Sequence, residues 1–408
     1  MSKMTDDLKM VHEEEMTNYD RIERAVVSVM RRHGAKIIET PTFEDYDTYG
    51  KYFPRLRREM IKTIGPSGEV LVLRPDVTVP LLKTAAREYP DPKKLLKFGY
   101  VSPVFREYYG KSTHGKYFRQ SGMEVLGDAT AECDGEVIAS AAECLEAVGI
   151  SDMRIDLGTV AFMDALFEEL RTTPNVISKI RDELETRNLV SYRDLIDTLS
   201  VTKPQRDVLL ALPELFGDYE ETRSCAENLC LNAKMQDALT RISQVHNYLA
   251  IAGYASRVQL DLGFTSHMGY YSDLVFRIYA KGALYSVASG GRYDQLAGGF
   301  GVPRPACGFG LNMNLLYEVL AEENLLGKPA PSCDLAICYE KADATLVKTI
   351  LALRARGFSV MGIDCGNTIE ASDYRFIIRY EKGKFLSDET VLTESQIEEI
   401  LKQWREGP

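Results

Sequence analysis

Strand-like segments on both sides of a long strand-free stretch constrain this chain more than any other feature. Residues 164–250 are rich in Leu, Glu and Arg, and prolines interrupt their helical periodicity. Short apolar or alternating runs lie outside this stretch, at residues 70–75, 153–158, 258–263, 271–280 and 284–291. Tight turns separate several of these runs, which favours antiparallel pairing. We therefore expect an α+β fold in which helices flank an antiparallel sheet and residues 164–250 form a helical insertion.

Two further segments indicate the domain organisation. Residues 19–33 have apolar side chains at helical spacing, Gly34 is suited to end that helix, and the strand IIETPTF follows. Residues 325–333, LLGKPAPSC, have the Pro and Gly content of a linker. We predict a core domain over 1–330 and a small α/β domain over 331–408, with a β-α-β-β pattern and a final helix.

Composition and charge exclude several classes of protein. The chain has 408 residues, 45% of them hydrophobic and 27% charged, which is typical of a soluble globular protein. No apolar run approaches the roughly 20 residues that a membrane span needs, and the N-terminus is acidic where a signal peptide would be basic. We expect a cytoplasmic protein. The net charge of −11 argues against a large nucleic-acid-binding surface.

The cysteines do not indicate a metal site. Eight of them are scattered along the chain, without the paired spacing or the nearby histidines of a zinc site. We interpret them as reduced thiols and expect no bound metal or cofactor.

The first candidate binding segment is VLVLRPDVTVPLLKTAA, in which a strand ends at Arg74-Pro75-Asp76 and a helix begins near Thr78. A carboxylate at Asp76 can accept hydrogen bonds from an ammonium group. Asp and Thr are also favoured at helix N-caps for purely structural reasons. Both interpretations of Asp76 and Thr78 stay open from this segment alone.

The second segment, KFGYVSPVFREYYGKSTHGKYFRQSGMEVLGD, has the pattern of a strand, a basic tyrosine-rich loop and a second strand. Arg106 ends the first strand. Gln120, Gly122 and Glu124 alternate on the second strand and so share one face. Gly122 would leave room between two polar side chains, which suits a small polar ligand, although a solvated hairpin face would show the same pattern.

Two more segments contain tyrosines and glycines. In LDLGFTSHMGYYSDLVFRIY, Tyr270 and Tyr271 lie in an alternating, strand-like run, and the segment SGGRYDQL contains Gly290 and Gly291, where a ligand could lie against the backbone. Neither segment matches a phosphate-binding loop or a dinucleotide-binding fingerprint.

Taken in order, these segments resemble the catalytic core of histidyl-tRNA synthetase and its paralogues. LRPDVT stands where the synthetases have Leu-Arg-Pro-Glu-Gly-Thr, and FREYYGKSTHGKYFRQSGMEVLG has the spacing of their motif 2 hairpin. GYYSDLVF matches the end of Arg-Gly-Leu-Asp-Tyr-Tyr, and SGGRYDQL matches Gly-Gly-Arg-Tyr-Asp-Gly-Leu. The resemblance implies a class II aminoacyl-tRNA synthetase-like fold that forms dimers through a first motif including ETPTFED and Pro41.

The resemblance also implies roles for seven residues. A pocket for free histidine would be lined by Asp76, Thr78, Gln120, Glu124, Tyr270 and Tyr271. Arg106 would hold a carboxylate or an α-phosphate. Carboxylate and hydroxyl groups suit this ligand, because its ammonium group donates hydrogen bonds and its imidazole needs both a donor and an acceptor.

The cations that activate an amino acid in the synthetases are replaced. Ser266 aligns with the catalytic arginine before the tyrosine pair, and Leu315 aligns with the motif 3 arginine that holds ATP. Losing one preorganised donor costs about a hundred- to a thousandfold in rate. We therefore expect no adenylate formation.

The C-terminal segment also departs from the synthetases, in the region that would bind tRNA. Only DCGNTIEASDY separates two predicted strands where a synthetase anticodon-binding domain has a helix, and residues 333–408 contain 10 Lys and Arg against 13 Asp and Glu. The whole chain is therefore similar to the regulatory subunits of ATP phosphoribosyltransferase. That family implies a non-catalytic protein in a hetero-oligomer with a short catalytic subunit, with L-histidine as effector and without tRNA.

Two alternatives stay open from the sequence. A working histidyl-tRNA synthetase would need Arg277 or Lys281 to replace the lost arginine. A free-standing synthetase-like binding module would act on an unrelated partner. The N-terminus also lacks the Gly-x-Arg-Asp opening common in the regulatory subunits.

Overall fold

The computed structural model describes residues 13–52, 60–106, 117–170, 172–263, 270–327, 331, 333–388 and 390–406. The chain forms two compact units, one containing Asn18–Leu326 and the other containing Gly327–Pro408. Among the described residues, none of the helices has both the length and the apolar character of a membrane span.

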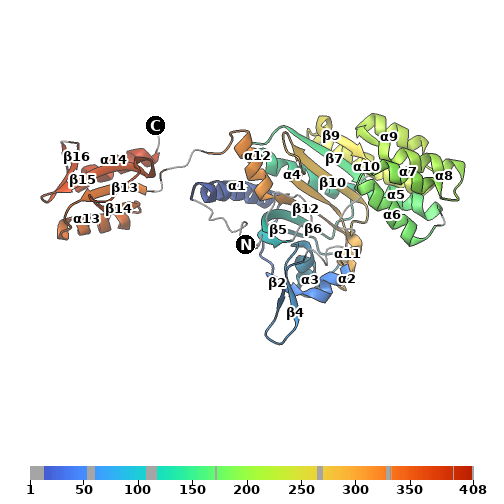
Figure 1. Ribbon diagram of the computed structural model, residues 1–408, viewed down its shortest axis with the longest axis horizontal. Helices are drawn as coiled ribbons and strands as arrows, with labels where there is room; N and C mark the ends of the chain where they lie inside the picture. The colour runs from blue at the N-terminus through green and yellow to red at the C-terminus, as the bar shows by residue number, and fades with distance from the viewer. Residues whose placement is uncertain are drawn as a thin grey trace. The chain divides into compact units, whose positions relative to one another are not determined.

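A nine-stranded sheet organises the first unit, in the order β1-β5-β6-β12-β11-β10-β7-β9-β8 (Figure 1). Its strands are β1 (Lys36–Ile37), β5 (Leu96–Phe105), β6 (Tyr117–Leu126), β7 (Met153–Thr159), β8 (Phe216–Asp218), β9 (Val258–Asp261), β10 (Leu274–Ala280), β11 (Ala288–Arg292) and β12 (Ala306–Asn312). The α+β class and the flanking helices are confirmed. The sheet is mixed rather than wholly antiparallel, because β1 pairs with β5 and β7 with β9 in parallel, each across a long connection.

The helix predicted near the N-terminus is α1 (Glu13–Arg32), which ends at Gly34 as expected. Gly34 has a positive φ of 80°, and Ala35 N donates to Met30 O across the end of the helix. The single strand expected after α1 is wrong. It is divided between β1 and β2 (Phe43–Asp45), with Pro41, which has no N–H to donate, in the break.

A buried arginine holds the chain between β1 and β2. Arg74 follows β4 (Val70–Leu73), which pairs with β2 and β3 (Lys62–Ile64) in a three-stranded sheet. Its guanidinium donates to Thr40 O (2.5 Å) and to Pro103 O (2.8 Å). Arg74 therefore connects the end of β4 to the chain between β1 and β2 and to β5. Asp76 follows two residues later. The helices nearby are α2 (Tyr46–Tyr52) and α3 (Thr78–Glu88).

Helices dominate residues 160–251, and this range is named the helical insertion below. Figure 1 shows α5 to α9 gathered at the end of the sheet beside β7 and β9. The insertion contains α5 (Val160–Glu169), α6 (Pro174–Glu185), α7 (Leu189–Asp197), α8 (Lys203–Ala211), α9 (Tyr219–Asn228) and α10 (Ala233–Ile251). The expectation of no strand here is wrong at β8, whose three residues pair with β9 and are too few to show a pattern in the sequence.

Two further helices complete the apolar core of the first unit. Helix α4 (Ala131–Ala147) is rich in small buried residues, and Gly135 lets Tyr248 of α10 pack against its backbone. Helix α12 (Met313–Glu322) adds Met313, Leu316 and Leu320 to the same apolar core. The short helix α11 is Asp294–Gly298.

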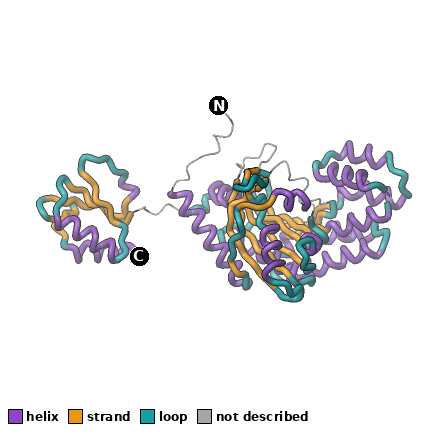
Figure 2. Tube along the Cα trace, turned by 90° about the horizontal axis from the view of Figure 1, so that it is seen from below, coloured by secondary structure: helices purple, strands orange, loops and turns teal. Residues whose placement is uncertain are grey.

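The second unit has a five-stranded sheet in the order β14-β13-β15-β16-β17. Figure 2 shows its strands in orange with purple helices beside them. The strands are β13 (Cys333–Tyr339), β14 (Val360–Asp364), β15 (Tyr374–Glu381), β16 (Lys384–Ser387) and β17 (Thr390–Leu392), with helices α13 (Ala344–Ala355) and α14 (Glu394–Glu406). Strands β16 and β17 were not predicted. Between β14 and β15 the described chain forms only a 3₁₀ turn, Ala371–Asp373, and no α-helix.

Candidate functional site

The polar face of β6 forms the floor of the site. Gln120, Gly122 and Glu124 lie on one face as predicted, and the sheet register places small residues beside them on β12. Glu124 is opposite Gly308 and Gly122 is opposite Gly310. A Cβ at Gly308 would lie 1.7 Å from Glu124 Oε2, so only glycine leaves room for this carboxylate.

Glu124 is buried and receives two hydroxyl hydrogen bonds. Thr78 Oγ1 donates to Glu124 Oε1 over 2.8 Å, and the Tyr293 hydroxyl donates to Glu124 Oε2. Burial raises the pKa of Glu124 to about 7, while the hydrogen bonds from Tyr293 and Thr78 act in the opposite direction. The structure therefore brings Thr78 and Glu124 together, with Tyr293 as a third member.

Asp76 has the structural role at the helix start that the sequence left open, and its ligand-binding role stays a prediction. Its Oδ1 accepts from Val79 N over 2.9 Å, in the first turn of α3, so one oxygen stabilises the helix start. Its Oδ2 is buried and has no hydrogen-bond partner among the described residues. Burial raises the pKa of Asp76 to about 6, opposed by the Val79 hydrogen bond and by the charge of Arg106. One carboxylate oxygen of Asp76 thus receives no hydrogen bond from the described residues.

Tyr100 fills the space expected over Gly122. It lies opposite Gly122 on β5, and a Cβ at Gly122 would lie 2.5 Å from the Tyr100 hydroxyl. Gln120 Nε2 donates to that hydroxyl over 2.8 Å. The predicted room for a ligand at Gly122 is therefore occupied by a protein side chain, and Tyr100 joins the site through Gln120.

The tyrosine pair forms an aromatic wall beside Glu124. The ring centroids of Tyr270 and Tyr271 are 4.7 Å apart, and Tyr270 meets Tyr293 edge to face at 5.8 Å. A Cβ at Gly291 would lie 2.9 Å from Tyr271 Cδ1. The glycine predicted to admit a ligand thus admits this tyrosine ring, and Gly290 similarly approaches Phe276. Burial raises the pKa of both Tyr270 and Tyr271.

Arg106 lies at the edge of this group. It forms an isolated bridge with Met60 at the end of β5, and its guanidinium lies 5.3 Å from the Phe118 ring centroid. Its charge favours the ionised forms of Asp76 and Tyr49, and so lowers their pKa values against the effect of burial. Arg106 thus brings a positive charge to the edge of this group.

Comparison with known proteins shows the family. Residues 7–316 match the family model described as histidyl-tRNA synthetase. The ATP phosphoribosyltransferase regulatory subunit of Bacillus licheniformis is 34% identical over 78% of this chain and 81% of its own length. That of Acetivibrio thermocellus is 30% identical over 91% of this chain and 89% of its own length. The chain belongs to the family of ATP phosphoribosyltransferase regulatory subunits. The resemblance inferred from the four sequence segments is confirmed.

Solved structures place this regulatory-subunit family member in the synthetase fold. A Bacillus halodurans structure described as an ATP phosphoribosyltransferase regulatory subunit/histidyl-tRNA synthetase is similar with a TM-score of 0.80 and 28% identity, over 91% of this chain and 96% of that one. Histidyl-tRNA synthetase from Nostoc is similar with a TM-score of 0.73 and 19% identity, over 98% and 99%. The class II synthetase-like fold is confirmed.

Leu315 is the residue that the sequence resemblance sets against the motif 3 arginine of the synthetases. Leu315 lies on α12, is 7% exposed and packs in the apolar core. Ser266 lies outside the described residues. Arg277, one possible replacement, is opposite the buried Asp156 in the β10–β7 register, and its charge favours the ionised form of that carboxyl. Asp156 of the neighbouring strand therefore compensates the positive charge of Arg277.

Sequence patterns missed two members of the site, Tyr100 and Tyr293. Tyr293 lies in SGGRYDQL, directly after the glycine pair, and its position there is the signal that could have found it. Tyr100 can be recognised only from the β5–β6 register.

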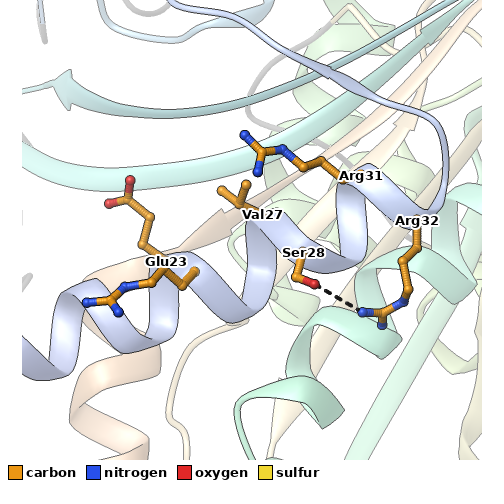
Figure 3. Close-up of a pocket in the computed structure, with 6 residues that line it drawn as sticks. Glu23, Val27, Ser28, Arg31 and Arg32 are labelled. Carbon is orange, nitrogen blue, oxygen red and sulfur yellow. Dashed lines mark hydrogen bonds between the residues drawn. The ribbon is translucent and has the colours of Figure 1, made fainter.

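A separate concavity lies along α1 (Figure 3). It is lined by Glu23, Arg24, Val27, Ser28, Arg31 and Arg32. Arg32 donates to Ser28 Oγ over 3.4 Å, and both residues are exposed. These solvated side chains form no buried polar group, and we assign no ligand to them.

Proposed function

We propose that this protein is a non-catalytic regulatory subunit that senses L-histidine and acts with a separate short ATP phosphoribosyltransferase catalytic subunit. That complex would join ATP to phosphoribosyl pyrophosphate, the first step of histidine biosynthesis, in the cytoplasm. The proposal includes a homodimer of this chain within the hetero-oligomer. The names of the relatives support the regulatory role.

The observation that carries histidine sensing is the pair of buried carboxyl groups, Asp76 and Glu124. Burial of an ionised carboxylate is costly unless a cation or several donors compensate it. Hydroxyl groups contact Glu124, and Asp76 keeps one unpaired buried oxygen. A ligand with an ammonium group and a ring N–H would supply the missing donors. Histidine has both groups on one small molecule.

The remaining side chains suit the other parts of the ligand. In our proposal Arg106 pairs with the histidine carboxylate, and the Tyr270–Tyr271 wall packs against its ring. Thr78 and Gln120 hold the carboxylate of Glu124 and the hydroxyl of Tyr100, so that these groups face the ligand in fixed positions. Discrimination would follow from buried polar groups that an analogue without the imidazole leaves unpaired.

Replacement of Glu124 by Gln tests this proposal. Losing a charge-assisted hydrogen bond forfeits about 1.5–3 kcal/mol of binding, so Glu124→Gln should raise the inhibitory histidine concentration about ten- to a hundredfold. The measurement is phosphoribosyl-ATP formation by the complex reconstituted with its catalytic subunit, titrated with histidine. Glu146→Gln is the control, because Glu146 pairs with Arg257 away from the site.

Both variants should still assemble and activate the catalytic subunit, because assembly is expected to use other surfaces. Unchanged histidine potency in an assembled Glu124→Gln complex would place the sensing site elsewhere. A wild-type chain that neither binds nor activates the catalytic subunit would contradict the regulatory role itself.

A further inference from the structure

A buried carboxylate is shared by two arginines at the junction of α4, α10 and β11. Asp134, in the first turn of α4, is fully buried. Arg292 of β11 donates to Asp134 Oδ1 through Nε (2.9 Å) and a terminal nitrogen (2.6 Å). Arg241 of α10 donates to Asp134 Oδ2 over 3.0 and 2.5 Å. Each guanidinium thus donates to a different oxygen of the Asp134 carboxylate.

Arg241 also reaches the segment that carries the tyrosine pair. Its Nε lies 3.1 Å from Asp273 Oδ2, and the other Asp273 oxygen accepts from Thr159 Oγ1 over 2.8 Å. Asp273 O accepts from Val160 N over 2.9 Å. Asp273 is two residues from Tyr271, so Arg241 anchors the chain directly after the aromatic wall.

The same ionic cluster leads to Glu124 by a second route. Ser272 N donates to Arg292 O over 2.8 Å, and Asp294 N donates to Ser272 Oγ over 3.2 Å. The residue between Arg292 and Asp294 is Tyr293, which donates to Glu124. Both tyrosine-bearing segments are therefore fastened to each other and to the carboxylate that Arg241 holds.

We infer that Arg241 is a positioning residue, through which the helical insertion controls the affinity of the site for histidine. This inference rests on the proposed function, because it concerns regulation of the proposed histidine site. Arg241 is the charged side chain of the cluster that belongs to the insertion. Movement of α10 away from the sheet would remove the ion pair of Asp273 with Arg241 and the two hydrogen bonds from Arg241 to Asp134, and would loosen both tyrosine segments. Conversely, histidine held by those segments would favour the docked insertion, since coupling between two sites is reciprocal.

The contacts of Arg241 require the planar guanidinium group of an arginine. Arg241 contacts two carboxylates from two directions, which a lysine ammonium on a flexible stem reproduces only in part. Loss of Arg241 leaves Asp134 paired with Arg292 and Asp273 bonded to Thr159, so the fold keeps its main contacts. The expected effect is on the geometry of the site rather than on folding.

The test compares Arg241→Gln, Arg241→Lys and Arg223→Gln in the full chain. Arg223 is the matched control, because it is also a partly buried arginine of the insertion and pairs with Glu220 and Glu227. Calorimetric titration should show histidine affinity about tenfold weaker for Arg241→Gln, an intermediate loss for Arg241→Lys and no change for Arg223→Gln. Adding Asp273→Asn to Arg241→Gln should cost less than the sum of the two single changes.

A second readout does not depend on histidine binding. Amide hydrogen exchange of ligand-free Arg241→Gln should be faster over residues 270–273 than in wild type and in Arg223→Gln, because Asp273 loses its ion pair with Arg241 and the segment is held less firmly. Unchanged exchange there, or wild-type histidine affinity in Arg241→Gln, overturns the inference. A wild-type chain without histidine binding would contradict the proposed function, and the exchange measurement would still decide the role of Arg241. If Arg241→Gln does not fold, Arg241→Lys and Asp273→Asn give the same two readouts.

Discussion

Burial defines the chemistry of single residues in this site. Glu124 has a carboxylate that receives hydroxyl donors but no guanidinium or ammonium contact among the described residues. Asp76 divides its two oxygens between the start of α3 and the buried interior. Both acids therefore retain protons at higher pH than exposed carboxyl groups do. A cationic ligand bound beside these acids, as we propose, would favour their ionised forms instead.

The ligand-free protein should lose stability as pH rises from about 4.5 through about 7. The pKa of Glu124 is about 7 in the folded chain against an ordinary 4.5, so between these values the folded state binds a proton that the unfolded state has released. The free energy of unfolding then falls with pH, by roughly 3 kcal/mol for a shift of this size. Glu124→Gln should remove that part of the slope.

Urea unfolding at pH 5 and pH 8, followed by circular dichroism, measures this effect. Glu146→Gln should keep the wild-type slope, because Glu146 lies on the exposed side of α4 and pairs with Arg257. A Glu124→Gln variant with an unaltered slope would show that Glu124 is ionised in the folded chain throughout.

At the scale of elements, glycines on β12 and β11 leave room for the side chains of the site. Gly308 and Gly310 leave room for Glu124 and Gln120 of the neighbouring strand, and Gly291 leaves room for Tyr271. Helix α12 follows β12 directly, and its buried residue Leu315 contributes apolar packing. In our proposal the strands keep an amino-acid pocket, while the adjoining helix supplies apolar packing at Leu315.

We expect no histidine-dependent ATP–pyrophosphate exchange by the purified chain. Adenylate formation concentrates negative charge on the phosphates, and each missing donor costs about a hundred- to a thousandfold in rate. The assay follows labelled pyrophosphate into ATP, with an active histidyl-tRNA synthetase as positive control. Turnover within about tenfold of a typical enzyme's 10 s⁻¹ would restore the synthetase alternative.

At the scale of the whole molecule, all proposed site residues belong to the unit that contains Asn18–Leu326. The second unit has its own apolar core, built from β13 to β17 and the two helices. Its composition of 10 Lys and Arg against 13 Asp and Glu over 333–408 does not favour a tRNA-binding surface. We propose that residues 331–408 form a separate domain that leaves the site unchanged.

A chain ending at residue 330 should therefore bind histidine with nearly wild-type affinity. The site residues and the Arg241 cluster remain, and the apolar core of the first unit is complete without the second. Calorimetric titration of the shortened and full chains makes the comparison, with Glu124→Gln in the short chain as the negative control. Loss of histidine binding by a folded short chain would assign the C-terminal unit a part in the site.

Local patterns in the sequence determined much of this protein. Alternation along a strand is a local property of the backbone, and it placed Gln120, Gly122 and Glu124 on one face. Turn and cap chemistry similarly indicated the end of α1 at Gly34 and the strand-to-helix junction at Asp76. The four ordered segments were enough to identify the family.

The tertiary structure alone decided which side chains fill the site. Tyr100 occupies the space at Gly122 because β5 pairs with β6 in one register, and a shift of one residue would point it to the other face. Arg241 reaches Asp134 across 107 positions of chain, a contact that no local pattern encodes. Strand order, register and helix docking depend on the burial of the whole apolar core, so they emerge only when distant segments pack together.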